Sequence, residues 1–101
     1  MRLHLVAAFM LSPLSSAAGP VEDGAALVKR NCSGCHAVTQ YDASPNPRAI
    51  PFRFIGRLYP INHLEEALAE GILVGHEMPE FVLNLNQVTA VIRYLESIQV
   101  R

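Results

Sequence analysis

The segment Cys32-Ser33-Gly34-Cys35-His36 constrains this chain more than any other part of its sequence. It contains both cysteines, three positions apart, and a histidine follows the second directly. On a helix, positions i, i+3 and i+4 share one face, so two thiols and an imidazole can meet one flat group from the same side. The pattern predicts covalent attachment of haem c through two thioether bonds, with His36 as one axial ligand of the iron.

Three other interpretations of this segment compete with haem attachment. A redox-active Cys-x-x-Cys is typical of chains that alternate strands and helices, and this sequence shows no such alternation. A structural zinc site takes four ligands, usually from two clustered pairs, but there is no third cysteine. The last alternative is a pair of buried thiols that lie beside a histidine by chance. The spacing favours haem over all three.

The first eighteen residues have the features of a secretory signal peptide. Arg2 supplies a positive start, residues 3–11 are mostly apolar, and small residues at 16–18 precede the expected cleavage site at Gly19. The apolar run is shorter than the ~20 residues that cross a bilayer, so we expect no membrane span in the mature chain. An uncleaved anchor is the alternative. Because haem is joined to such cysteines outside the cytoplasm, we expect export to the periplasm.

Residues 19–101 are long enough for one small domain with a marginal apolar core. A covalently held porphyrin would supplement this core, because it gives short helices a large apolar surface to bury against. Without Arg2, the chain keeps seven basic and nine acidic side chains, a net charge of −2. This charge makes nucleic acid an improbable partner.

The apolar periodicity predicts an all-α domain with three main helices. The first is expected over roughly Val21–Cys35. The second is expected over roughly His63–Glu70, with Asn62 as its N-cap. The third is expected over roughly Gln87–Gln99, capped by Asn86.

The segment Ser44–Pro60 contains four prolines and is expected to form no regular helix. It also carries four large apolar side chains that must be buried, namely Ile50, Phe52, Phe54 and Ile55. We therefore expect an ordered loop that wraps the core rather than a linker.

Met78 is the candidate for the second axial ligand of the iron. It precedes Pro79 in a loop between the second and third helices, and the proline prevents a helix from forming across the ligand. A methionine can also simply fill a gap in a core. His76, two residues away, is the rival ligand, since imidazole binds iron well. A thioether ligand would raise the reduction potential, whereas a second imidazole would lower it.

Taken together, these residues resemble the class I monohaem cytochromes c, the small soluble electron carriers, over nearly all of residues 19–101. The resemblance rests on the Cys32-x-x-Cys35-His36 segment, on the Met78-Pro79 pair and on an aromatic residue in the last helix. In that family, a glycine eight residues before the first cysteine lets the first and last helices cross closely. Gly24 and Tyr94 are in the corresponding positions.

The resemblance also implies a proline carbonyl that accepts a hydrogen bond from the proximal histidine, His36. Pro51 and Pro47 are both candidates for this role. More broadly, it implies a cytochrome c fold, with three helices and ordered loops around one haem whose iron is held by His36 and Met78.

The function implied by the resemblance is electron transfer, with redox partner proteins that dock transiently. One alternative is a haem enzyme or a small-ligand binder with a labile sixth position. Another is a cytochrome subunit of a larger oxidoreductase, so the chain is expected to be a monomer or such a subunit. A stable Met78 ligand would favour the carrier, because a saturated iron leaves no position for oxygen or peroxide.

Overall fold

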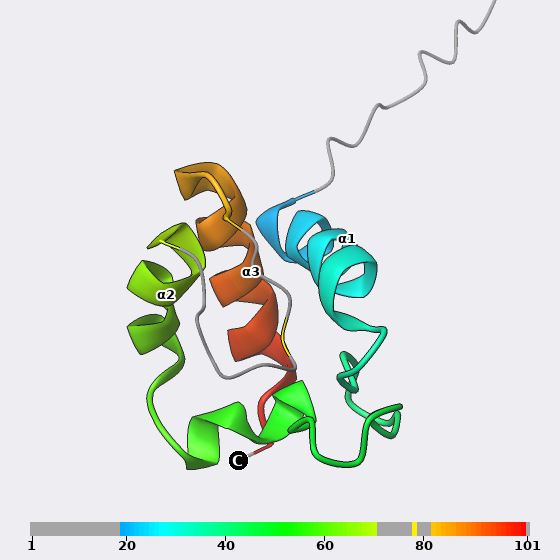
Figure 1. The fold of residues 1–101 in the computed structure, drawn as a ribbon. Helices are drawn as coiled ribbons and strands as arrows, with labels where there is room; N and C mark the ends of the chain where they lie inside the picture. Colours follow the sequence, from blue (N-terminus) through cyan, green and yellow to red (C-terminus); the bar gives the residue numbers. More distant parts are fainter. Residues whose placement is uncertain (1–18, 71–77, 79–81, 101) are drawn as a thin grey trace, which may run out of the picture.

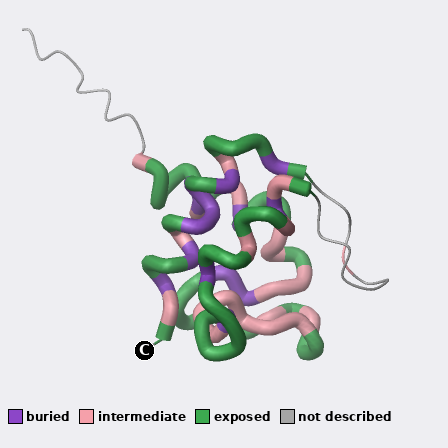
Figure 2. Tube along the Cα trace, turned by 90° about the vertical axis from the view of Figure 1, so that its left-hand side faces the viewer, coloured by how far each residue is buried: buried purple, intermediate pink, exposed green. Residues whose placement is uncertain are grey.

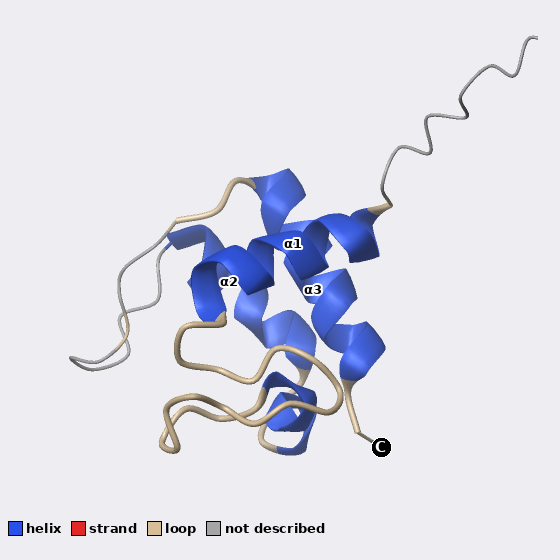
Figure 3. Ribbon diagram, turned by 90° about the vertical axis from the view of Figure 1, so that its right-hand side faces the viewer, coloured by secondary structure: helices blue, strands red, loops and turns tan. Residues whose placement is uncertain are grey.

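The computed structural model describes residues 19–70, 78 and 82–100. Three α-helices and two short 3-10 helices follow one another along the chain: α1 (Pro20–Cys32), η1 (Phe52–Arg57), η2 (Ile61–His63), α2 (Leu64–Glu70) and α3 (Leu85–Ile98). In Figure 1, α3 lies between α1 and α2, and it packs against both. None of the described residues belongs to a strand, so the expected all-α class is confirmed (Figure 3).

The helix α1 ends at Cys32, three residues earlier than we expected. It begins at Pro20, whose fixed φ suits the first position of a helix and whose missing amide proton is not needed there. Ser33 forms the C-cap, and its hydroxyl donates a hydrogen bond back to a carbonyl of the last helical turn. The amide of His36 still donates to the carbonyl of Cys32 over 2.9 Å, so Cys35 lies in a hydrogen-bonded turn that extends the helix.

The helix α3 begins two residues earlier than we expected, and its N-cap is Asn84 rather than Asn86. The side chain of Asn84 accepts from the amide of Gln87 over 2.9 Å, and the side chain of Gln87 accepts from the amide of Asn84 over 3.0 Å. This reciprocal pair is a capping box. Asn86 cannot form one, because the residue three positions after it is Thr89.

The helix α2 begins at Leu64 rather than at His63, and Asn62 does not cap it. Asn62 lies instead inside η2, because the carbonyl of Pro60 accepts a hydrogen bond from the amide of His63 over 3.1 Å. A 3-10 turn thus takes the place of the expected cap. The described part of this helix extends to Glu70, where we expected it to end.

The helices α1 and α3 cross at Gly24, as the resemblance implied. A Cβ atom built on Gly24 would lie 2.0 Å from the carbonyl oxygen of Ala90 and 2.8 Å from the Cβ atom of Tyr94. Such distances leave no room for a side chain, so glycine is what allows the two backbones to approach. The contact buries Gly24 itself and Val28 one turn later.

The loop over residues 44–60 is ordered, but it contains a helix that we did not expect. The 3-10 helix η1 begins directly after Pro51 and ends before Pro60, so neither proline interrupts it. Of its apolar side chains, Ile55 is buried in the core, whereas Phe52 and Phe54 are only partly buried. The buried segments of the chain gather in the interior, with the exposed ones around them (Figure 2).

The predicted signal peptide, residues 1–18, lies outside the described residues, as does His76. Among the helices of the described segments, none is both long enough and apolar enough to span a membrane.

Candidate functional site

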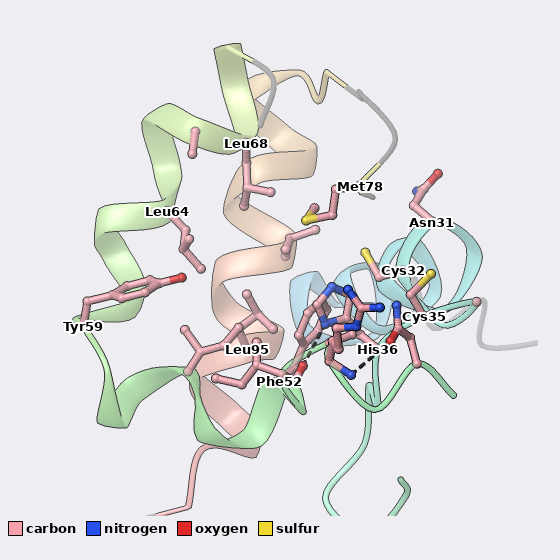
Figure 4. A pocket seen from close by; sticks show the side chains of 18 residues that line it. Asn31, Cys32, Cys35, His36, Phe52, Tyr59, Leu64, Leu68, Met78 and Leu95 are labelled. Atoms are coloured by element: carbon pink, nitrogen blue, oxygen red, sulfur yellow. Dashed lines mark hydrogen bonds between the residues drawn. The ribbon is translucent and has the colours of Figure 1, made fainter. Parts of the chain in front are cut away.

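A cavity of about 660 Å³ lies where the end of α1 meets η1, α2 and α3 (Figure 4). Ligand pockets in proteins commonly have volumes of ~300–1,000 Å³, so this one can hold a sizeable organic group. Most of its wall is apolar, with Ile50, Phe52, Ile55, Leu64, Leu68 and Leu95 among the lining side chains. Cys32, Cys35, His36 and Met78, which the sequence singled out, all line this same cavity.

The two cysteines lie at the end of α1, on one side of the cavity. Cys32 is the last residue of the helix and Cys35 is in the turn that follows, and their sulfur atoms are not joined in a disulfide. Figure 4 shows both thiols on the same side of the cavity. One flat group could therefore meet both along a single edge.

Burial raises the pKa of the Cys32 thiol to about 11. A redox-active Cys-x-x-Cys needs the opposite effect, because its attacking sulfur reacts as a thiolate and has a lowered pKa. The environment of Cys32 therefore disfavours a thioredoxin-like role.

The ring of His36 is held in a defined orientation by the backbone. Its Nδ1 atom lies 2.7 Å from the carbonyl oxygen of Ile50. A carbonyl only accepts hydrogen bonds, so Nδ1 carries a proton, and in the neutral imidazole the lone pair is then on Nε2. This is the tautomer in which an imidazole binds a metal through Nε2. The expectation that Pro51 or Pro47 supplies the acceptor was wrong, because the carbonyl belongs to the residue directly before Pro51.

Phe52 packs beside the ring of His36, with 4.6 Å between the ring centroids and 35° between the planes. The amide of Phe52 donates to the carbonyl of Ala37 over 2.9 Å. The stretch after the cysteines is therefore tied to the start of η1 at His36 and at Ala37. Rotation of the imidazole would break the hydrogen bond to Ile50 and collide with the aromatic ring.

The turn after His36 is tied to the last helix. The hydroxyl of Tyr94, on α3, donates a hydrogen bond to the carbonyl of Val38. Burial and the nearby charge of Asp42 raise the pKa of this hydroxyl, so it stays protonated as a donor. The crossing at Gly24 sets the position of Tyr94. Because Tyr94 is hydrogen-bonded to the turn after His36, the packing of α1 against α3 also affects the position of that turn.

Asp42 closes the turn that follows His36. Its carboxylate accepts hydrogen bonds from the amide of Val38 over 3.0 Å, from the amide of Thr39 over 2.9 Å and from the hydroxyl of Thr39 over 2.7 Å. Desolvation opposes ionisation of this carboxyl, but the hydrogen bonds outweigh it and hold the pKa of Asp42 below the ordinary 3.8.

This shift predicts a loss of stability in acid. Because the folded pKa lies below the unfolded one, the contribution of Asp42 is present in full above about pH 5 and is lost progressively below it. We expect Asp42→Asn to lower the free energy of unfolding by about 0.5–1 kcal/mol at pH 7, a difference that shrinks as the pH falls. Urea unfolding at a series of pH values measures it, with the exposed Glu96→Gln as control. A difference that is equal at all pH values would contradict this account.

Met78 adds a thioether sulfur to the two thiols that line the cavity. It is partly buried, and Figure 4 shows its sulfur atom turned toward the interior of the cavity. Leu68 and Val91, from α2 and α3, also line this space. Met78 and His36 reach the cavity from separate segments of the chain.

Within residues 19–70, 78 and 82–100, no cluster of three or more histidine, cysteine, aspartate or glutamate side chains could hold a metal ion by itself.

Three polar lining residues were not singled out from the sequence, namely Asn31, Asn46 and Tyr59. Nothing marked them, because polar side chains on a helix or in a proline-rich loop are ordinary surface residues. The carbonyl of Ile50 was also missed, although the following Pro51 did signal an extended backbone at that position.

No protein-family model, curated protein or solved structure matches this chain.

Proposed function

We propose that this chain is a monohaem c-type cytochrome with a cytochrome c fold, and that it transfers electrons. The observation that carries the proposal is the convergence of Cys32, Cys35, His36 and Met78 on a single cavity with mostly apolar walls. These four residues come from the end of α1, the turn after it and a distant loop. They supply the two thioether sulfurs and the two axial ligands that a covalently bound, six-coordinate haem requires.

The residues that line the cavity fit a haem in their chemistry as well as in their number. Two thiols on one side can form thioethers with the two vinyl groups along one porphyrin edge. The Nε2 atom of His36 has the free lone pair that an axial ligand needs, because Ile50 holds the proton on Nδ1. The apolar walls suit the flat hydrocarbon body of a porphyrin. When bound, the haem iron would supply one-electron cycling between the ferrous and ferric states.

The protein's contribution is to fix ligands and exclude water. Ile50 and Phe52 hold the plane of the His36 imidazole, so the ligand needs little movement when the charge of the iron changes. Met78 as second axial ligand would close the remaining position and stabilise the ferrous form. A closed site favours a carrier over a haem enzyme or a small-ligand binder.

The predicted signal peptide supports a periplasmic setting for this function. Removal of residues 1–18 would leave the cytochrome domain, residues 19–101, in the periplasm. There it would exchange electrons with partner proteins through small, transient interfaces, as a monomer or as the cytochrome subunit of a larger oxidoreductase.

Covalent attachment tests the proposal directly. Expressed with its leader in a bacterium that has a cytochrome c maturation system, the wild type is expected to have the intact mass of residues 19–101 plus one haem. Cys32→Ser and Cys35→Ser should each leave at most one thioether, which shifts the absorption of the pyridine haemochrome. The double variant should release all haem into acidified acetone.

Ser33→Ala is the matched control, since it changes a residue between the cysteines without removing a sulfur. It should retain covalent haem at the wild-type level. A wild type that is exported at its unmodified mass, or that is purified with one zinc ion per chain, would refute the proposal.

A further inference from the structure

Gln99, the residue after the last turn of α3, uses its side-chain amide to hold η1. Its Oε1 atom accepts a hydrogen bond from the amide of Gly56 over 2.7 Å. Its Nε2 atom donates to the carbonyl of Phe52 over 2.7 Å and to the carbonyl of Leu95 over 2.8 Å. One side chain thus joins the first and fifth residues of η1 to α3.

The approach of Gln99 to η1 is close. A Cβ atom on Gly56 would lie 3.0 Å from the Oε1 atom of Gln99, a tight contact that glycine avoids. Beside it, the amide of Val100 donates to the carbonyl of Arg53 over 2.9 Å. Figure 1 shows the C-terminal end of the chain beside the green segment that contains η1.

The start of η1 is also the part of the chain that orients His36. Phe52 is held by Gln99 at its carbonyl and by Ala37 at its amide, and its ring lies 4.6 Å from the ring of His36. Two residues before Phe52, Ile50 accepts the hydrogen bond from Nδ1 of His36. The intervening Pro51 has a fixed φ, so a shift of Phe52 moves the carbonyl of Ile50 with it.

The donor strength of an imidazole depends on this Nδ1 hydrogen bond. A strong acceptor on Nδ1–H makes Nε2 more basic, and a more basic ligand stabilises ferric iron relative to ferrous iron. If the carbonyl of Ile50 moves away, Nε2 becomes less basic and the reduction potential rises. The position of η1 should therefore influence the redox chemistry of the site.

We infer that Gln99 is a positioning residue for the axial ligand His36, acting through Phe52 and the carbonyl of Ile50. The inference rests on the proposed function, since it assigns the ligand role to His36. Gln99 does not line the cavity and touches no reacting atom. Its effect is transmitted by the backbone hydrogen bonds at the start of η1.

Gln99→Glu is the most informative variant. The carboxylate keeps the size of the side chain and can still accept from Gly56, but it cannot donate to the carbonyls of Phe52 and Leu95. Gln99→Ala removes all three hydrogen bonds. Gln40→Ala is the matched control, because Gln40 is exposed and its side chain takes no part in the hydrogen bonds that join Gln99 to η1.

The readouts are made on the holoprotein, at a temperature where circular dichroism shows each variant fully folded. We expect the Nδ1 proton of His36 to exchange with solvent about tenfold faster in Gln99→Glu, and the midpoint potential to rise. Gln40→Ala should match the wild type in both. If Gln99→Ala fails to fold, Gln99→Glu decides the question.

A folded Gln99→Glu variant with the exchange rate and the potential of the wild type would overturn the inference while leaving the cytochrome proposal intact. A wild-type protein that carries no haem, or whose iron is not bound by His36, would overturn the proposed function and this inference together.

Discussion

Gly24→Ala is expected to lower the free energy of unfolding by about 2–3 kcal/mol, which corresponds to a fall in Tm of roughly 10–20 °C for a domain of this size. The added methyl group would lie 2.0 Å from the carbonyl oxygen of Ala90 and 2.6 Å from its carbon. Alanine gains up to about 1 kcal/mol over glycine in a helix, but this gain is smaller than the cost of separating two packed backbones. Thermal unfolding followed by circular dichroism measures the change.

Gly34→Ala is the control for this prediction. A Cβ atom there would meet nothing within 4 Å, so the free energy of unfolding should change by less than about 0.5 kcal/mol. If Gly24→Ala and Gly34→Ala lowered the free energy of unfolding equally, the helix crossing at Gly24 would not be the cause of the destabilisation. An unchanged Tm for Gly24→Ala would contradict the close approach of α1 and α3.

The existence and type of the three α-helices could be predicted from the sequence, because each carries an apolar stripe with helical periodicity. Their boundaries were less predictable, since they depend on competition between neighbouring groups. Asn84 and Asn86 are equally good N-caps in isolation. The choice of Asn84 required Gln87 to complete the capping box, a detail outside the apolar pattern.

The short helix η1 was missed for a related reason. The prolines of residues 44–60 correctly marked the places where regular structure is interrupted, but Phe52–Arg57 lies between two of them. A segment of this length carries too little periodicity to predict a helix. Its position is fixed instead by contacts with distant residues such as Gln99.

The side chains of the candidate site were easier to predict than the groups that orient them. Cys32, Cys35, His36 and Met78 stand out because their side chains have specific chemistry at a specific spacing. The acceptor for His36 is a backbone carbonyl, and every residue has one, so the sequence cannot distinguish Ile50 from its neighbours. Backbone groups become specific only after the chain has folded.

In the proposed haem site, Met78→Ala is expected to lower the midpoint potential of the iron by more than about 60 mV, a tenfold change in the balance between ferrous and ferric forms. The thioether sulfur favours the ferrous state, and water or an added ligand in its place does not. Added imidazole should then bind to the variant, whereas the wild type should resist it. Met78 is the only methionine of residues 19–101, so a haem-shifted methionine methyl signal in the ferrous wild type belongs to it.

Met78→Leu separates the loss of the ligand from the loss of volume, because leucine fills a similar space without a sulfur atom. It should reproduce the lowered potential of Met78→Ala, whereas Leu68→Ala, which enlarges the same cavity, should leave the potential near that of the wild type. A low-spin spectrum and an unchanged potential in both Met78 variants would exclude Met78 as the ligand. His76→Ala should then be the variant that loses the low-spin spectrum, and two imidazole ligands would give the proposed haem site a lower potential from the start.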